Sequence, residues 1–263
     1  IAVSSGKGGV GKTNSVVNLA VAFSYMGKRV LLMDADLGLG NIDILLGLAP
    51  KYNIGHLLRG EKTLEEVLIK GPAGIMILPA SSGVHELTHL SAEERLSLST
   101  HLEGLDGGID IMLIDTGAGI SSNVLFFNAA AQEIIVVVSP EPTSLTDAYA
   151  LMKVLSKKHC EKSFKLLVNT VKSKKEGLDV YKKLSLAAQR FLDVSIDYLG
   201  CVLLDENVPR AVVQQRPVVE LYPDSKSSEC FRAIAREICG APAVKTVKGG
   251  MQFFWRQMLN RSA

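Results

Sequence analysis

The sequence predicts an α/β fold, a doubly wound, mainly parallel sheet of seven to eight strands with helices on both faces. Short apolar runs alternate along the chain with segments that are apolar at helical spacing, as the strands and connecting helices of a parallel sheet do. The runs are continuous rather than alternating, as in residues 29–34, which is typical of strands buried on both faces.

Length and composition favour one large globular domain. The chain has 263 residues, 47% of them hydrophobic, and a net charge of +2 that gives no global basicity for nucleic acid. It has no long uncharged apolar run and no secretory signal. Because it begins at Ile1, inside a predicted strand and without Met, we expect a piece of a longer protein. No C-x-x-C motif is present, so we expect free thiols in a reducing cytoplasm at Cys160, Cys201, Cys230 and Cys239.

The chain opens with a strand, a glycine-rich loop and a helix. Residues 1–3 are apolar and predict the end of a strand, and residues 14–25 are apolar at helical spacing. The loop between them fits G-x-x-x-x-G-K-[ST], with the fixed positions Gly6, Gly11, Lys12 and Thr13. This pattern is typical of a phosphate-binding loop (P-loop, residues 6–13), whose backbone N–H groups and helix N-terminus face phosphate.

We expect the P-loop to bind nucleotide phosphates and Mg²⁺. Lys12 is expected to contact the β- and γ-phosphates, and the Thr13 hydroxyl to hold Mg²⁺. Lys7 follows the first glycine, where an ordinary P-loop accepts almost any residue. The other residues expected around the nucleotide are Gly6, Gly8, Gly9, Val10, Gly11 and Asn14.

Acidic residues end two further predicted strands. Residues 29–34 lead into Asp34 and Asp36, and residues 109–115 end at Asp115. Alternate residues of an extended chain face the same way, so Asp34 and Asp36 can face one metal and water site. One of them can orient the waters of Mg²⁺ while the other polarises the attacking water, and Asp115 is the candidate that organises the metal. A helix-capping role is the competing interpretation of each acid.

The remaining elements alternate to residue 239. Ser91 and Glu94 predict a capping box at the start of one helix. The basic segment 172–175 is interpreted as a solvated turn, and residues 63–69 as a helical piece. Further strands are expected at 74–79, 133–139, 164–169 and 198–204, and a loop at 80–83. Helices are expected at 91–102, 122–131, 145–157, 208–215 and 225–239, and another helix follows residues 172–175 and ends near residue 192. Ligands of such sheets bind at the carboxyl ends of the strands, where all the candidate residues above fall.

Three segments resemble the MinD/ParA class of ATPases. Residues 7–13 are similar to its deviant P-loop, residues 34–43 to its first switch and residues 115–120 to its second switch. Within the class the chain is most similar to the FlhG/FleN branch, which sets polar flagellar number. The segments that carry this finer match are residues 11–14, 79–83, 141–150, 222–225 and 250–254.

The resemblance implies an ATPase that is slow unless stimulated and that binds ATP or ADP with Mg²⁺. It assigns Lys7 to the ATP of a partner subunit, across a homodimer. It also assigns Asp36 to the hydrolytic water, and Asp34 and Asp115 to the metal site.

The resemblance further implies an adenine site and one departure from the class. Asn169 matches the adenine-binding asparagine, and the region of Leu204 and Asp205 is expected on the other side of the base. Gly117 stands where relatives usually carry Ala or Pro, and we expect this glycine to loosen the second switch.

Residues 241–263 are expected to form a tail that follows the ATPase domain of residues 1–240. The tail has four basic residues and no acidic one. We expect an amphipathic helix with an apolar aromatic face and a cationic polar face, which is typical of interfacial membrane helices. Docking of this helix on the core is the alternative. The expected membrane contacts are Met251, Phe253, Phe254, Trp255, Met258 and Leu259.

Together these features predict an ATP-dependent dimerisation switch that regulates flagellar number and placement. It is expected to cycle between a cytoplasmic monomer and an ATP dimer that is peripheral on the inner membrane at the pole. By resemblance, its partners are a second copy, the flagellar GTPase FlhF, a FleQ-type transcription activator and flagellar switch proteins. The alternatives are a cell-division-site MinD ATPase, a ParA-type DNA-partitioning ATPase or a binding module with a dead ATPase. Near-neutral charge and the aromatic tail disfavour DNA, although residues 172–175 keep it open.

Overall fold

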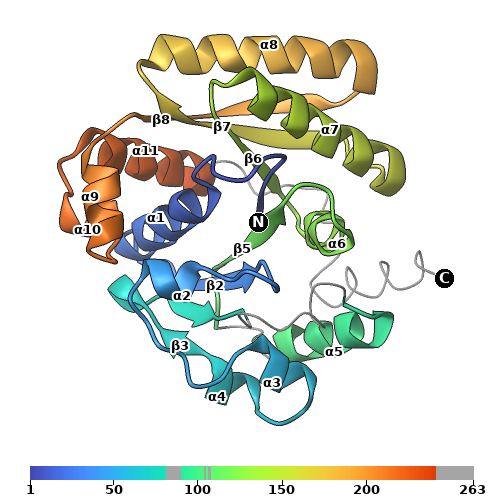
Figure 1. The fold of residues 1–263 in the computed structure, drawn as a ribbon, viewed down its shortest axis with the longest axis vertical. Helices are drawn as coiled ribbons and strands as arrows, with labels where there is room; N and C mark the ends of the chain where they lie inside the picture. The colour runs from blue at the N-terminus through green and yellow to red at the C-terminus, as the bar shows by residue number, and fades with distance from the viewer. Residues whose placement is uncertain (81–89, 104, 106–107, 241–263) are drawn as a thin grey trace.

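The computed structural model describes residues 1–80, 90–103, 105 and 108–240, and it contains an eight-stranded sheet (Figure 1). The strand order is β3-β4-β2-β5-β1-β6-β7-β8, and every neighbouring pair is parallel except β3 and β4. The predicted fold class is therefore confirmed. The strands are β1 (Ala2–Ser5), β2 (Val30–Ala35), β3 (Ile69–Lys70), β4 (Met76–Leu78), β5 (Ile111–Ala118), β6 (Ile134–Val138), β7 (Ser163–Val171) and β8 (Ser195–Leu203).

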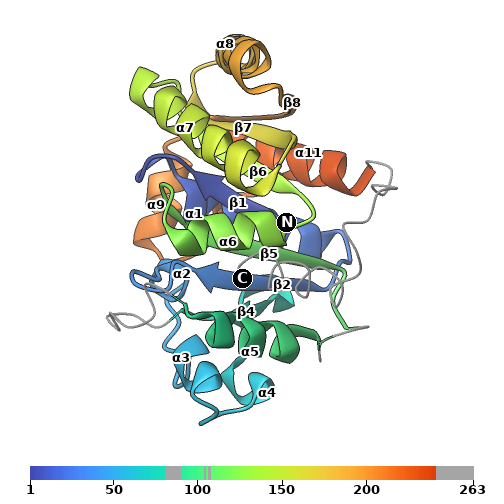
Figure 2. The same ribbon diagram turned by 90° about the vertical axis from the view of Figure 1, so that its right-hand side faces the viewer.

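Helices cover both faces of the sheet, as the two views show (Figures 1 and 2). The hydrophobic core on one face includes residues of α1, α10 and α11, and the core on the other includes residues of α3 to α8. The helices are α1 (Lys12–Tyr25), α2 (Ile42–Leu45), α3 (Ile54–Leu58), α4 (Leu64–Val67), η1 (Pro72–Gly74), α5 (Ala92–Glu103), α6 (Ser122–Ala130), α7 (Pro142–His159), α8 (Lys174–Leu192), α9 (Asn207–Val213), α10 (Val218–Leu221) and α11 (Lys226–Gly240).

The central strands are buried on both sides because their side chains alternate between two cores. In β6, Ile135 and Val137 pack in the core of α1 and α11, whereas Val136 and Val138 pack in the core of α7 and α8. Such a strand needs apolar residues at every position, which is why its sequence is a continuous apolar run. β1 lies between β5 and β6, so the loop after it begins in the middle of the sheet.

Several element boundaries differ from the prediction. α7 begins at Pro142, earlier than expected, because proline is favoured in the first helical turn. α8 begins at Lys174 because the side chain of Ser173 accepts a hydrogen bond from the Glu176 N–H. The prediction of a solvated turn at 172–175 is therefore wrong for residues 174 and 175, which are helical. The capping box of Ser91 and Glu94 is confirmed by both of its hydrogen bonds.

Two further differences come from strand pairing. β5 continues to Ala118 instead of ending at Asp115, because β2 and β1 extend the ladder on both sides. The short strand β3 pairs antiparallel with β4 where the sequence predicts the end of a helical piece. α10 was not predicted.

All four cysteines are free thiols, as expected. Among the described helices, none has both the length and the apolar character needed to cross a membrane. Most of the expected loop at 80–83 and the whole tail at 241–263 lie outside the described residues.

Candidate functional site

The P-loop connects β1 to α1 at the carboxyl end of the sheet, and its glycines meet three different constraints. Gly9 and Gly11 have φ values of 79° and 83°, which favour glycine. A Cβ on Gly6 would lie 2.1 Å from the Asp147 carbonyl carbon, so close packing against α7 excludes any side chain there. A Cβ on Gly8 or Gly9 would have no neighbour within 4 Å. The loop therefore leaves space over Gly8 and Gly9 for a ligand to approach the backbone.

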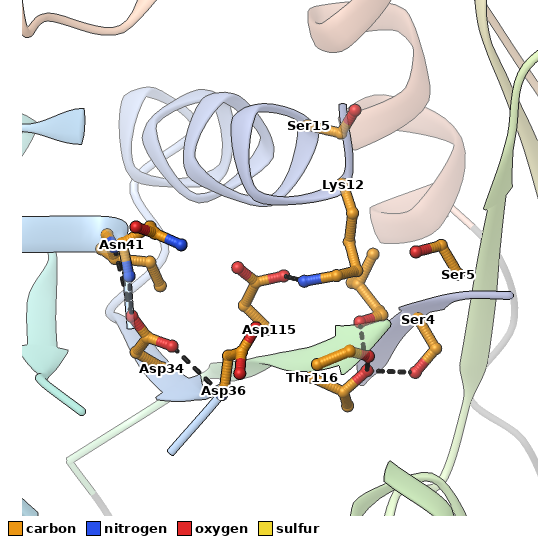
Figure 3. Close-up of polar contacts among 12 residues, drawn as sticks. Ser4, Ser5, Lys12, Ser15, Asp34, Asp36, Asn41, Asp115 and Thr116 are labelled. Carbon is orange, nitrogen blue, oxygen red and sulfur yellow. Dashed lines mark hydrogen bonds and ion pairs between the residues drawn. The ribbon is translucent and has the colours of Figure 1, made fainter. Parts of the chain in front are cut away.

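Lys12, at the start of α1, and Asp115, in β5, form a buried ion pair (Figure 3). Lys12 Nζ lies 2.5 Å from Asp115 Oδ1, and the side chains are 9% and 2% exposed. Burial raises the pKa of Asp115, although the Lys12 cation and a hydrogen bond from Thr13 oppose that rise. The pair keeps the lysine ammonium in the site and gives both charges a partner.

The oxygen donors next to Lys12 fit Mg²⁺ that binds together with a nucleotide. Asp115 supplies a carboxylate, and the Thr13 hydroxyl lies within hydrogen-bond reach of it. Within the described ranges, no three His, Cys, Asp or Glu residues converge as ligands for a metal. Mg²⁺ commonly binds through one or two protein oxygens, phosphate oxygens and water, so this sparse donor set suits it.

Asp34 is 2% exposed, and both of its carboxylate oxygens accept hydrogen bonds from the backbone of the first switch. Oδ1 accepts from the Asp36 N–H at 3.2 Å, and Oδ2 accepts from Asn41 at 3.0 Å and Ile42 at 3.2 Å. Burial, together with the nearby charge of Asp115, raises the pKa of Asp34 to about 7. Asp34 therefore organises the first switch; its expected contact with Mg²⁺ stays a prediction.

Asp36 is half-buried and lies where the two switches meet. A Cβ on Gly117 would lie 3.5 Å from Asp36 Oδ1 and 3.6 Å from Val124, which is ordinary contact. An alanine at position 117 would therefore fit, and the glycine leaves open space beside the Asp36 carboxylate. The role of Asp36 in activating water stays a prediction.

Lys7 has different partners from Lys12, although both belong to the P-loop. Lys7 Nζ donates to Glu141 Oε2 at 2.6 Å and to Thr143 Oγ1 at 3.1 Å, at the N-terminus of α7. The Lys7 and Glu141 side chains are 39% and 62% exposed. Exposed ion pairs contribute little, so this contact can be exchanged at low cost.

The two residues expected at the adenine make bonds within the protein. Asn169 Nδ2 donates to the Val10 carbonyl oxygen at 2.9 Å. Asp205 Oδ2 accepts from the Ser227 N–H at 3.0 Å and from its hydroxyl at 2.9 Å, and Oδ1 accepts from the Asn207 N–H at 3.0 Å. Asp205 thus caps the first turn of α11. For both residues, contact with the base stays a prediction.

A buried polar cluster below the P-loop was missed by sequence reasoning. Ser4 Oγ lies 2.6 Å from Thr116 Oγ1, and Asn128 Nδ2 donates to Ser4 Oγ at 2.7 Å. The cluster joins β1, β5 and α6. Its only sequence signal is a hydroxyl residue at the end of each apolar strand. The Lys7–Glu141 pair was missed as well, since 134 residues separate its members.

The chain is similar to known proteins along its whole length. Residues 1–167 match the model of a family described as an AAA domain. The antiactivator FleN of Pseudomonas aeruginosa is 43% identical over 263 residues, which cover 100% of this chain and 94% of FleN. The flagellum site-determining protein YlxH of Helicobacter pylori is 33% identical, with 98% and 89% covered. The septum site-determining protein MinD of Pyrococcus horikoshii, complexed with Mg-ADP, superimposes with a TM-score of 0.73 at 26% identity, with 90% and 94% covered.

Proposed function

The chain belongs to the MinD/ParA class of ATPases, in its FlhG/FleN branch, and from this premise we propose that it is an ATP-dependent dimerisation switch on the cell membrane. As a member of the class it hydrolyses ATP to ADP and phosphate and binds the nucleotide with Mg²⁺. As a FleN-type protein it regulates flagellar number.

The bonding of Lys7 supports the dimer. Lys12 already provides a cation beside Asp115 in the subunit's own site, so a second lysine in the P-loop is not required there. Lys7 instead bonds to Glu141 and Thr143 through a partly exposed contact. In the proposed mechanism, Lys7 leaves Glu141 and contributes its charge to the nucleotide of the second copy, in the manner of an arginine finger.

The other site residues have roles within one subunit. The backbone of Gly6, Gly8, Gly9, Val10, Gly11 and Asn14 surrounds the phosphates in the proposed complex. Lys12 would neutralise phosphate charge, and Thr13 and Asp115 would hold Mg²⁺, which when bound would neutralise the charge that develops on the phosphates. Asp36 accepts a proton from, or orients, the attacking water. Asp34 keeps the first switch in place around that water.

The tail supplies the proposed membrane contact. Its apolar and aromatic residues, from Met251 to Leu259, would insert into the interface, while its basic residues would face anionic headgroups. One amphipathic helix binds weakly. Two helices on one dimer bind much more tightly, because the second insertion is intramolecular. ATP would thereby control membrane attachment by setting the number of tails in each assembly.

We propose that the flagellar partners bind the ATP dimer. The candidates are the GTPase FlhF, a FleQ-type transcription activator and flagellar switch proteins. The P. aeruginosa relative FleN is an antiactivator, which supports an activator as one partner. Pull-down with purified candidates in ATP and in ADP tests this point, and equal capture in both nucleotides would contradict it.

The mass of the protein in solution tests the switch. We expect light scattering to report a doubled mass with ATP and Mg²⁺, and a monomer with ADP. Lys7→Ala is expected to remain monomeric in ATP while it still binds nucleotide, and Lys158→Ala, which changes an exposed lysine near the far end of α7, is the matched control. A wild-type protein that stays monomeric in ATP would refute the switch. A Lys7→Ala protein that dimerises normally would remove the role of Lys7 across the interface.

Co-sedimentation distinguishes the membrane from DNA. We expect ATP-dependent binding to vesicles that contain anionic lipid, and no binding to duplex DNA. Trp255→Glu is expected to abolish vesicle binding while leaving the ATP dimer intact. ATP-dependent binding to DNA instead of vesicles would favour a ParA-type partitioning protein.

A further inference from the structure

We propose that Asn169 is a positioning residue for the P-loop, so that it controls the binding of the phosphates as well as the binding of the base. The inference deepens the nucleotide site proposed above, and it concerns a contact within one subunit. It follows from the place where the carboxyl end of β7 meets the backbone of the P-loop.

The Asn169 amide holds the peptide at the turn of the loop. Asn169 is 8% exposed, and its Nδ2 donates to the Val10 carbonyl oxygen at 2.9 Å across 159 residues of sequence. Val10 is 5% exposed and lies between Gly9 and Gly11, two glycines of the P-loop that have positive φ. A carbonyl oxygen only accepts, so this contact determines which side of the amide carries the nitrogen.

The space at Gly11 confirms how tightly the two segments fit. A Cβ on Gly11 would lie 2.2 Å from Asn169 Nδ2. Gly11 is therefore required both by its φ of 83° and by the amide packed against it. The backbone at this point of the P-loop cannot shift toward β7 without displacing Asn169.

The backbone of β7 is distorted where it presents this side chain. Thr170 has a φ of 56°, a left-handed conformation that β-branched residues rarely adopt. The register between β7 and β8 also shifts between Val168 and Val171, and the Thr170 hydroxyl donates to the Asn169 carbonyl at 2.8 Å. Irregularities of this kind redirect a side chain and are found where the surrounding structure requires them.

These contacts give the Asn169 amide two separate uses. One N–H is bonded to Val10, and in the described part of the chain the amide makes no second hydrogen bond, so its oxygen and its other N–H remain available to a base. The bond to Val10 acts on the P-loop, which faces the phosphates of the nucleotide and not its base. It fixes the peptide from which the P-loop directs its N–H groups at phosphate, whether or not a base is bound.

Inorganic tripolyphosphate, which has no base, tests the proposal. We compare wild type with Asn169→Ala by titration calorimetry, using Mg-tripolyphosphate and Mg-ATP. We expect the affinity for tripolyphosphate to fall roughly tenfold, about the effect of one lost hydrogen bond, and the affinity for ATP to fall at least as much. Unchanged tripolyphosphate binding beside weaker ATP binding would overturn the proposal, since Asn169 would then contact the base alone.

Three further measurements separate positioning from general destabilisation. Asn53→Ala removes the capping asparagine of α3 and is expected to leave tripolyphosphate binding unchanged. Asn169→Asp has no donor for Val10 and should match Asn169→Ala, or exceed its effect; wild-type affinity in this variant would contradict the role. Hydrogen exchange at residues 8–13 should be faster in Asn169→Ala, or in Asn169→Ser if the alanine variant does not fold. None of these readouts requires a dimer, so failure of the ATP switch would be seen separately.

Discussion

Two lysines of one loop differ in what surrounds them. Lys12 is buried against Asp115, and removal of either partner would leave an uncompensated charge in the interior. Lys7 is partly exposed and paired with Glu141, where solvent screens the attraction. The first lysine is held in its own site, and the second is free to exchange partners. The two lysines are therefore suited to different tasks, although only five positions separate them.

Glu141→Gln tests whether the contact with Lys7 competes with dimerisation. The variant removes the charge that holds Lys7 in the single subunit. We expect the ATP dimer to form at a protein concentration about two- to fivefold lower, because an exposed ion pair contributes at most about 1 kcal/mol. Analytical ultracentrifugation in ATP measures this, with Glu206→Gln on the exposed pair with Arg210 as the control. A weaker dimer would show that Glu141 stabilises the dimer instead.

The Asp34 carboxyl predicts a pH dependence of stability in the nucleotide-free protein. Its pKa is about 7 in the folded chain, against 3.8 as the ordinary value. Between these values the folded state binds the extra proton, so this group makes the free energy of unfolding fall as pH rises from about 4 to about 7. The slope is at most about 1.4 kcal/mol per pH unit.

Urea unfolding from pH 5 to pH 8, with chelator and without nucleotide, measures this effect. Asp34→Asn should lose less stability than wild type over the range. Asp179→Asn, at an exposed position of α8, should keep the wild-type slope. Parallel curves for wild type and Asp34→Asn would contradict the assignment.

At the scale of elements, side chains from distant segments hold the parts of the site together. Asp34, at the end of β2, accepts hydrogen bonds from the first switch, and Asn169, at the end of β7, donates to the P-loop. Asp205, just after β8, caps the first turn of α11. Each contact joins the carboxyl end of a strand to a neighbouring loop or helix. The nucleotide site thus depends on the strand ends for its shape.

The cap on α11 can be tested directly. Asp205→Ala removes three hydrogen bonds and a negative charge near the N-terminus of the helix. We expect the free energy of unfolding to fall by about 1–2 kcal/mol. Urea denaturation measures this, and Glu206→Ala next to it, which is exposed, should change it by no more than about 0.5 kcal/mol. An Asp205→Ala protein with wild-type stability but weaker ATP binding would contradict the capping role and favour the base contact.

In the whole molecule, the groups expected to respond to ATP lie together at the carboxyl end of the sheet. The P-loop, which includes Lys7, follows β1, and the two switches lie at the carboxyl ends of β2 and β5. Figure 3 shows Lys12, Asp34, Asp36 and Asp115 together at these strand ends. In the proposed cycle two copies meet at this end of the sheet. ATP hydrolysis in either copy then weakens the whole assembly and its attachment to the membrane.

Asp36→Ala tests the cycle as a whole. If Asp36 activates the hydrolytic water, its loss should abolish ATP turnover, roughly a 10²-fold effect or more, without loss of nucleotide binding. The ATP dimer should then persist and remain on anionic vesicles after wild type has been released. Sedimentation over time measures this, and Asp43→Ala, at a half-buried acid in the same switch, is the control. An Asp36→Ala protein that stays monomeric in ATP would contradict the role given to Asp36.

Much of the fold was predictable because its signals are local. Continuous apolar runs marked the central strands, and the capping box of Ser91 and Glu94 marked a helix start. Element ends were less predictable. β5 runs on to Ala118 because its neighbours extend the ladder, and β3 exists only through its pairing with β4. Neither pairing can be recognised from the residues of β5 or β3 alone.

By itself, the sequence determined the fold class, the P-loop and the strand-end acids, because each is a pattern of neighbouring residues with one physical meaning. The tertiary structure alone decided what those residues touch. It placed Lys7 against Glu141, Asp34 on the backbone of the first switch and Asn169 on Val10. The last of these contacts spans 159 residues, and a hydrogen bond depends on distance in space. Only folding brings its two groups within reach.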